Sequence, residues 1–426
     1  MNPRPRKTRP ASPATPGHSP PSPAPDLRSP ISHLRSPISH LPPPVCDVTL
    51  LAVTGMSPAV LTETVWALAH EPEPVLPARV IAVTTTQGRR QIETHLLAPQ
   101  DRLGGLSPWD CLRRSLIEEG FDLANRLRFG TTGDDIRVMT TLEHGSGRSR
   151  ELDDLRTPSD NEAAANFILE QVRGIVENPD TRLIASLAGG RKTMGAILYA
   201  ALTLAARETD RITHVLVSEP FETLRDFWYP RQPGGPIPER GGAAHDPAAA
   251  RIDLADLPFV PLRNLFQREL GRSAGTFSRL VESCRANVRQ RIAETLHLAI
   301  DTTRTELEVN GTLVRLAPLE HLLLLFLARR TKHGEPPYGA YAEAVDDLNA
   351  FRQELIESAP KNNFGDWRHA DSLRASWDEQ DIRKAASGIR TKLPRYGSAP
   401  AALASCLPEK GRCSLEVPRA GIHIKG

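Results

Sequence analysis

Five short apolar runs separated by helical patterns most constrain what this 426-residue chain can fold into. The runs cover residues 48–54, 79–85, 135–139, 182–187 and 213–217. Apolar runs of this length are typical of strands buried on both faces of a parallel sheet. Their alternation with helices predicts a doubly wound α/β sheet that is covered by helices on both faces. We expect this fold over residues 46–230.

Three segments carry signals for the start of a helix. Ser57-Pro58 places an N-cap serine before a proline at the first helical position. Residues 159–162, Ser-Asp-Asn-Glu, resemble a capping box before an alanine-rich stretch. A third helix is expected over residues 192–207.

The remaining chain divides by composition. Residues 1–45 hold 14 of the 38 prolines and a repeated unit, Leu-Arg-Ser-Pro-Ile-Ser-His, which predicts a disordered tail or a basic arm for nucleic acid. Residues 231–250 are rich in Gly, Pro and Ala and are expected to form a linker. Residues 251–426 are expected to form a second unit, with a hairpin turning at Asn310-Gly311.

Composition excludes several classes of protein. No stretch approaches the roughly 20 apolar residues that a membrane span needs, and no apolar core of a signal peptide follows the N-terminus. Five scattered cysteines argue against a disulfide framework and for a reducing cytoplasm. Neither a CxxC pair nor an HExxH motif occurs, so we expect no zinc site of those kinds.

Two loops at strand ends are candidates for ligand binding, because open parallel sheets bind ligands at the carboxyl ends of their strands. The first loop is Thr54-Gly-Met-Ser-Pro-Ala59, and the second is Ser186-Leu-Ala-Gly-Gly-Arg-Lys-Thr193. Gly189 and Gly190 would let the backbone approach a ligand, and the following amides open a helix that favours an anion. With the cations Arg191 and Lys192, the second loop predicts a phosphate site.

Two familiar motifs do not fit these loops. A Walker A loop needs Gly-Lys in sequence, whereas Arg191 separates Gly190 from Lys192. A nucleophile elbow needs a second glycine where Ala59 stands, and Pro58 removes an amide. We therefore do not expect a P-loop nucleotidase or a serine hydrolase.

Several motifs together resemble the CRISPR-associated ring nucleases. They are Gly-Met-Ser-Pro-Ala-Val-Leu-Thr-Glu63, Val-Thr-Thr-Thr-Gln-Gly88, Leu-Asp-Asp-Leu-Arg-Thr-Pro-Ser-Asp-Asn161, Ser-Leu-Ala-Gly-Gly-Arg-Lys-Thr193 and Asp-Phe-Trp-Tyr-Pro230. The resemblance implies a Rossmann-like CARF domain, a homodimer and a shared pocket for cyclic oligoadenylate, the messenger of type III CRISPR systems, with four adenylates expected. It also implies catalytic roles for Ser57 and Lys192. The ligand-binding residues that it implies are Gly55, Met56, Thr86, Gln87, Gly189, Gly190 and Arg191.

In the reaction that the resemblance implies, a ribose 2′-OH attacks the adjacent phosphorus and leaves a 2′,3′-cyclic phosphate. The protein must orient the hydroxyl and stabilise negative charge on phosphorus, and neither a metal nor a cofactor is required. Lys192 would supply the charge, and Ser57 would bond the 2′-OH or a phosphate oxygen. No residue resembles a dedicated general base, so we expect slow turnover.

Structural roles compete with these assignments. Ser57 could be only an N-cap, and Arg191 and Lys192 only a solvated helix start. Gln87 and Arg89 could line the pocket or cap a helix. Three aspartates, Asp153, Asp154 and Asp160, would suggest a metal site if they clustered, but a capping box explains Asp160 more simply.

The C-terminal unit resembles a winged helix of the response-regulator type. Residues 307–327 resemble its opening, 381–393 its recognition helix and 413–424 its closing wing hairpin. From Asp381 onward nine Lys/Arg stand against three Asp/Glu, and the cations expected to contact DNA are Arg383, Lys384, Arg390 and Lys392. Gly388 within the helix and the long insert of residues 331–380 depart from this pattern. A role in dimerisation or in gating the pocket is the alternative.

Two hypotheses of different classes follow. The first is a dimeric ring nuclease, and the second is a regulator that senses cyclic oligoadenylate and binds DNA without cleaving the ring. An effector ribonuclease is not expected, because residues 251–426 contain no Arg-x-x-x-x-His motif.

Overall fold

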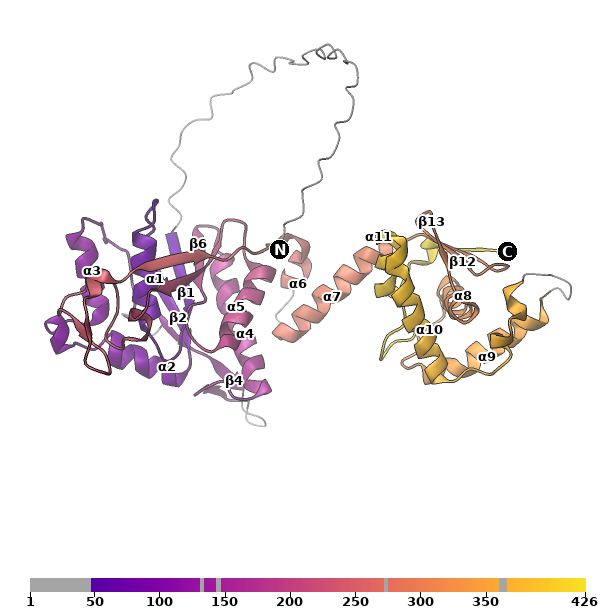
Figure 1. The fold of residues 1–426 in the computed structure, drawn as a ribbon, viewed down its shortest axis with the longest axis horizontal. Coiled ribbons are helices and arrows are strands. Elements are labelled where there is room, and N and C mark those ends of the chain that lie inside the picture. Colours follow the sequence, from indigo (N-terminus) through magenta and orange to yellow (C-terminus); the bar gives the residue numbers. More distant parts are fainter. Residues whose placement is uncertain (1–46, 131–133, 143–146, 272–274, 360–365) are drawn as a thin grey trace, which may run out of the picture. The chain divides into compact units, whose positions relative to one another are not determined.

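The computed structural model describes residues 47–130, 134–142, 147–271, 275–359 and 366–426 (Figure 1). The predicted tail of residues 1–45 lies outside the described residues.

A six-stranded sheet organises the first part of the described chain, in the order β10-β7-β6-β1-β2-β3. Its strands are β1 (Asp47–Val53), β2 (Arg79–Thr84), β3 (Ile136–Val138), β6 (Thr181–Ser186), β7 (Arg211–Val217) and β10 (Ile252–Asp256). All neighbours pair in parallel except β10, which is antiparallel to β7. The five predicted strands and the parallel sheet of a mixed α/β fold are confirmed.

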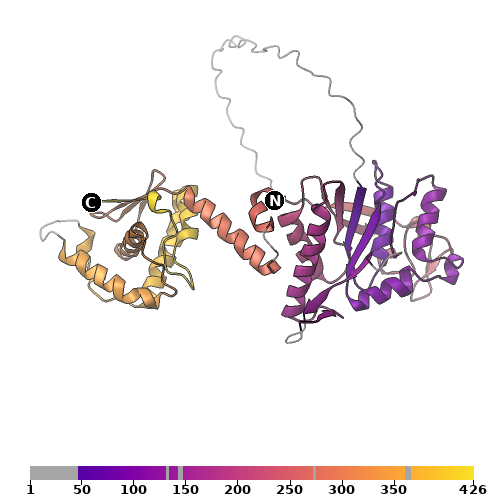
Figure 2. The same cartoon turned by 180° about the vertical axis from the view of Figure 1, so that it is seen from behind.

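Alternate residues of strand β1 face two separate cores. Leu51 and Val53 pack with α4 and α5, whereas Leu50 and Ala52 pack with α1 and α3. Helices therefore cover both faces, and α4 and α5 lie side by side in both views (Figures 1 and 2). The helices of this part are α1 (Ala59–Ala69), α2 (Thr86–Gln91), α3 (Pro108–Glu118), α4 (Pro158–Val176), α5 (Lys192–Ala205), α6 (Gln267–Gly271) and α7 (Phe277–Glu294).

Two helix starts differ from the sequence prediction. The N-cap of α1 is Pro58, and the Ser57 side chain makes no capping bond. The capping box of α4 joins Thr157 to Asp160, so this helix begins one residue before the predicted cap Ser159. A capping box at Asp160 is nevertheless confirmed, with Thr157 as the residue that accepts from its amide.

The predicted linker of residues 231–250 is folded. It contains the short hairpin of β8 (Ile237–Pro238) and β9 (Ala244–His245), and Ile237 is buried against Phe221, Leu224 and Phe227. The next strand, β10, completes the first sheet, so the boundary expected at residue 250 does not mark the end of that sheet. A second small hairpin joins β4 (Thr140–Leu142) to β5 (Ser149–Glu151).

A four-stranded sheet with its own core forms the C-terminal body, in the order β13-β12-β11-β14. Its elements are β11 (Leu298–Asp301), β12 (Glu306–Val309), β13 (Thr312–Arg315), α8 (Pro318–His333), α9 (Val345–Glu357), α10 (Glu379–Lys392), α11 (Ser398–Leu403) and β14 (Ile422–Lys425). The hairpin at Asn310-Gly311 is confirmed, and both residues have positive φ, as a type I′ turn requires.

One predicted element of the winged helix is wrong. Residues 413–424 were expected to form a closing hairpin, but they contain a single strand, β14, which pairs in parallel with β11. The helix expected over residues 381–393 is present as α10. Trp367 and Trp377, from the long insert, are buried in the core of this body, so the insert contributes to its packing.

Candidate functional site

The two candidate loops meet where the strand order of the larger sheet reverses. The chain runs from β1 outward to β2 and β3, and then returns to place β6 on the other side of β1. The carboxyl ends of β1 and β6 therefore flank a topological switch point, which is where open α/β sheets bind ligands. A Cβ added at Gly55, after β1, would lie 3.0 Å from the Cα of Gly190, after β6.

Close backbone packing and a positive φ require glycine at two positions of the β6–α5 loop. A Cβ at Gly189 would lie 2.7 Å from the carbonyl oxygen of Val53, closer than real side chains approach backbone. Gly190 has a φ of +77°, a conformation that favours glycine. The glycines thus allow this loop to pack onto the end of β1 and leave its backbone beside the candidate site.

A cavity of about 440 Å³ lies at this edge of the sheet. Among the residues predicted to bind the ligand, those that line it are Gly55, Met56, Ser57, Gln87, Gly189, Gly190 and Arg191. Thr86 and Lys192 are not among the lining residues, although each adjoins one that is. Asp154 and Leu155 also line the cavity, and they were not predicted as site residues.

The Ser57 hydroxyl is available to a ligand. Ser57 is exposed, and its Oγ has no hydrogen-bond partner among the described residues. Its backbone carbonyl accepts a bond of 3.3 Å from Thr54 Oγ1, which helps to hold the loop. The interpretation of Ser57 as an N-cap is wrong, because Pro58 occupies that position.

The two cations of the second loop differ in their partners. Arg191 forms a bidentate ion pair with Asp154, with 2.6 Å between Nε and Oδ1. Lys192, the first residue of the 14-residue helix α5, is exposed and forms no ion pair with any described residue. The helix amides and this free ammonium together favour an anion at this end of α5.

Asp153 and Asp154 bind several of the predicted site residues. Asp153 accepts hydrogen bonds from Thr86 Oγ1 at 2.6 Å and Gln87 Nε2 at 2.9 Å, and these bonds lower its pKa. The hydrogen bond from Arg191 holds the pKa of Asp154 well below its usual range. Both carboxylates are thus engaged by neighbouring donors, and of the two only Asp154 lines the cavity.

The contacts of Arg89 and Asp160 decide between the alternative roles that the sequence left open for them. Arg89 neither lines the cavity nor caps a helix, since its guanidinium pairs with Glu151 of β5 at 2.7 Å. Asp160 belongs to the capping box of α4. No group of three or more His, Cys, Asp or Glu side chains suited to a metal occurs among the described residues.

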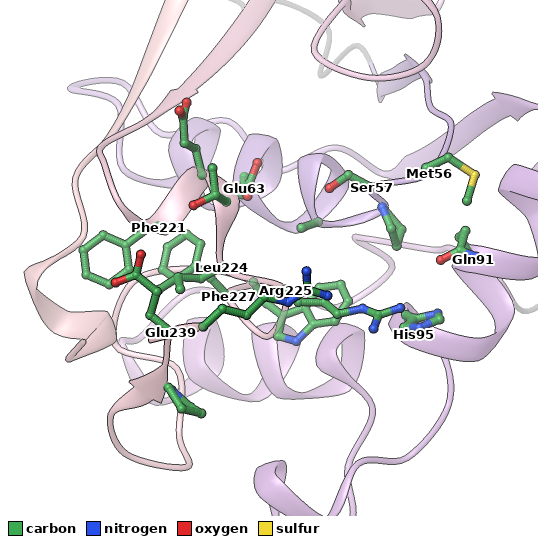
Figure 3. Close-up of a pocket in the computed structure, with 17 residues that line it drawn as sticks. Met56, Ser57, Glu63, Gln91, His95, Phe221, Leu224, Arg225, Phe227 and Glu239 are labelled. Carbon is green, nitrogen blue, oxygen red and sulfur yellow. The ribbon is translucent and has the colours of Figure 1, made fainter. Parts of the chain in front are cut away.

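A second cavity, of about 690 Å³, shares the Met56–Ser57 loop with the first (Figure 3). Glu63 of α1 lines it and is only 7% exposed. Burial raises the pKa of this carboxyl to about 8. Sequence analysis did not identify Glu63 as a site residue. Two signals were available in the sequence. Glu63 is the one acid in the largely apolar helix α1, and it ends the motif Gly-Met-Ser-Pro-Ala-Val-Leu-Thr-Glu63.

The cations expected on the recognition helix are mostly used within the fold. Arg383 pairs with Glu379, the Arg390 guanidinium donates to the carbonyls of residues 407 and 408, and Lys392 lies 2.6 Å from Glu320. Only Lys384 of the four has no partner among the described residues. A Cβ at Gly388 would lie 2.5 Å from Glu320 Oε1, so a larger residue there would displace the Glu320 carboxylate.

Comparison with known proteins identifies the family. The family model described as CRISPR-associated protein NE0113 matches residues 57–289, more than half of the chain. The match begins at Ser57 and extends through β10 and most of α7. No curated protein matches the sequence. None of the helices in the described segments is long and apolar enough to span a membrane. The chain therefore belongs to the CRISPR-associated protein NE0113 family.

Proposed function

We propose that the chain is a metal-independent ring nuclease that binds and cleaves cyclic oligoadenylate, with cyclic tetra-adenylate as the expected substrate. Membership of a CRISPR-associated family and the motif resemblance to ring nucleases support this proposal. The observation that carries it is the Ser57 hydroxyl, which has no partner among the described residues and lies in a glycine-lined cavity at the switch point. Lys192, next to the lining residue Arg191, forms no ion pair in the same part of the chain.

The proposed reaction needs no external nucleophile. The ribose 2′-oxygen forms a bond to the adjacent phosphorus while the bond from phosphorus to the 5′-oxygen breaks. The 2′-hydroxyl loses its proton and the departing 5′-oxygen gains one, so the ring opens to a linear product with a 2′,3′-cyclic phosphate and a 5′-hydroxyl. Lys192 stabilises the charge on phosphorus, and Ser57 orients the 2′-hydroxyl or a phosphate oxygen.

The exposed edge of the cavity supports a substrate larger than one nucleotide. Met56 is 64% exposed where the two cavities meet, and Lys192 is exposed at the start of α5. In a homodimer, two such edges would meet on one ring. The dimer is part of this proposal and is tested by the mass of the protein in solution.

The test incubates the protein with labelled cyclic tetra-adenylate in EDTA, with Lys192→Ala and Lys384→Ala as matched variants. Linear products that end in 2′,3′-cyclic phosphate, lost only in the Lys192 variant, would support the ring nuclease. A ring with 2′-O-methyl riboses should bind and resist cleavage. Cleavage of that ring would contradict attack by the 2′-hydroxyl.

Binding without cleavage would instead support a sensor that regulates DNA. Lys384 is the observation that favours this second function, as an exposed cation on α10 that pairs with none of the described residues. Salt-sensitive DNA binding that depends on the ring and is lost in Lys384→Ala would support it.

A further inference from the structure

The second cavity is bounded by the Ser57 loop, by α1, by the π-helical turn after α2 and by the segment after β7 (Figure 3). Its aromatic wall consists of Phe221, Phe227 and Trp228, and the rings of Phe221 and Phe227 lie 5.2 Å apart. Each of the three is at most 5% exposed, so these rings give the cavity an apolar wall. Nucleic-acid bases pack favourably against aromatic side chains.

Two polar groups at this cavity lack hydrogen-bond partners among the described residues. Glu63 makes no hydrogen bond or ion pair with any described residue, although it is 93% buried. Trp228 Nε1 is a buried donor without an acceptor. Trp228 Nε1 is wholly buried, and leaving such a donor unsatisfied costs about 1–3 kcal/mol. The Glu63 carboxyl lines the cavity, so it is the group that a ligand there can bond.

The two cavities share Met56, Ser57 and the loop that carries them. A nucleotide whose phosphate lies against the β6–α5 loop would therefore have its base within reach of the second cavity. This continuity distinguishes the second cavity from an unrelated surface hollow.

We propose that this second cavity is a base subsite, in which the Glu63 carboxyl group recognises adenine. As a neutral acid, Glu63 donates its O–H to a ring nitrogen of adenine and accepts from the exocyclic amine. The inference rests on the proposed function and adds the residue that selects adenylate.

The protonation of Glu63 determines which purine fits. A neutral carboxylic acid offers one donor and one acceptor, which complements the amine and ring nitrogen of adenine. An ionised carboxylate offers only acceptors and would complement the two donors of guanine. Burial favours the neutral form of Glu63 by raising its pKa. Other titratable side chains that line the cavity are His95, Glu222, Arg225, Glu239 and Arg240.

The experiment measures affinity for cyclic tetra-adenylate and cyclic tetra-guanylate in the full chain and in three variants. Glu63→Leu removes both bonding groups and should weaken adenylate binding by about 10-fold or more. Glu63→Gln keeps one donor and one acceptor and should restore most of the affinity. Glu118→Gln, an exposed glutamate on α3, is the matched control and should bind as the wild type does.

The melting temperature separates recognition from a structural role. Because Glu63 bonds none of the residues that the structure describes, Glu63→Leu should melt no lower than the wild type while it loses ring affinity. Unchanged adenylate affinity in Glu63→Leu would overturn the inference, as would equal wild-type affinity for the two rings. A loss of affinity matched by a large fall in melting temperature would also overturn it. If the wild type binds neither ring, the proposed function fails and the subsite fails with it.

Discussion

Two buried glutamates, one in each body of the chain, differ in how the fold treats them. Glu63 is 7% exposed and Glu320 is 8% exposed. Glu320 accepts from Lys392 at 2.6 Å and from the Ala317 amide at 2.8 Å. Glu63 has no such partner among the described residues. Burying a polar group without a hydrogen bond is unfavourable. Glu320 is compensated within the C-terminal body, whereas no described residue compensates Glu63.

Two lysines show the same contrast. Lys392 is bonded to Glu320, whereas Lys192 has no ion-pair partner in the described chain. Polar groups left unpartnered at the carboxyl edge of the larger sheet are available to a ligand. In the C-terminal body, Lys392 and Glu320 pair with each other and so stabilise that body. This contrast supports our proposal that the chemistry lies in the α/β body.

The largest expected effect is the loss of ring cleavage when Lys192 is replaced. Lys192→Ala should lower the single-turnover rate of ring cleavage by about 100- to 1000-fold, the loss typical of removing one group that stabilises transition-state charge. Its melting temperature should stay unchanged, because Lys192 bonds nothing within the described fold. A rate within 3-fold of the wild type would remove Lys192 from the site.

The unpartnered glutamate should make stability depend on pH. Burial raises the pKa of Glu63 from 4.5 to about 8 in the folded chain, because it disfavours the charged form. Below about pH 4.5 the group is neutral in both states and this penalty is absent, and the penalty grows as the pH rises toward 8. We expect the free energy of unfolding to fall by about 3 kcal/mol between pH 5 and 8, relative to Glu63→Gln. Denaturant titrations of both proteins measure this difference, and parallel profiles would contradict it.

The paired lysine should show the opposite pattern to Lys192. Lys392→Ala leaves Glu320 buried without its cation and should lower the free energy of unfolding by about 1–2 kcal/mol. Ring cleavage should remain at the wild-type rate. Lys384→Ala, which removes an exposed lysine from the same helix, is the control and should leave stability unchanged. A loss of cleavage in Lys392→Ala would break the division between the two bodies.

The smallest expected effect is on ring binding through Arg191, the cation of the candidate site that forms an ion pair. Asp154→Asn releases Arg191 from its ion pair and should tighten ring binding by about 3- to 10-fold, because a phosphate no longer competes with a carboxylate. Asp371→Asn disrupts an exposed pair with Arg374 and should change nothing. Weaker binding in Asp154→Asn would mean that Asp154 holds Arg191 in its binding position. Titration calorimetry measures both variants.

Local sequence patterns were sufficient for much of the architecture. Apolar runs predicted the parallel strands because those strands are buried on both faces. Asn310-Gly311 predicted its hairpin because few other residues adopt positive φ so readily. The same patterns misplaced the end of the first sheet, since the pairing of β10 with β7 follows 34 residues of intervening loop and hairpin.

The sequence by itself determined which loops carry glycine, serine and two adjacent cations, because these features are encoded locally after each strand. Only the tertiary structure decided which groups are free. Arg191 and Lys192 are adjacent in sequence, but Asp154 reaches only Arg191. Glu63 and Glu320 are both glutamates within apolar helices, but only Glu320 meets a lysine. The partners lie 37 and 72 residues away along the chain, and such long-range contacts depend on how the elements pack.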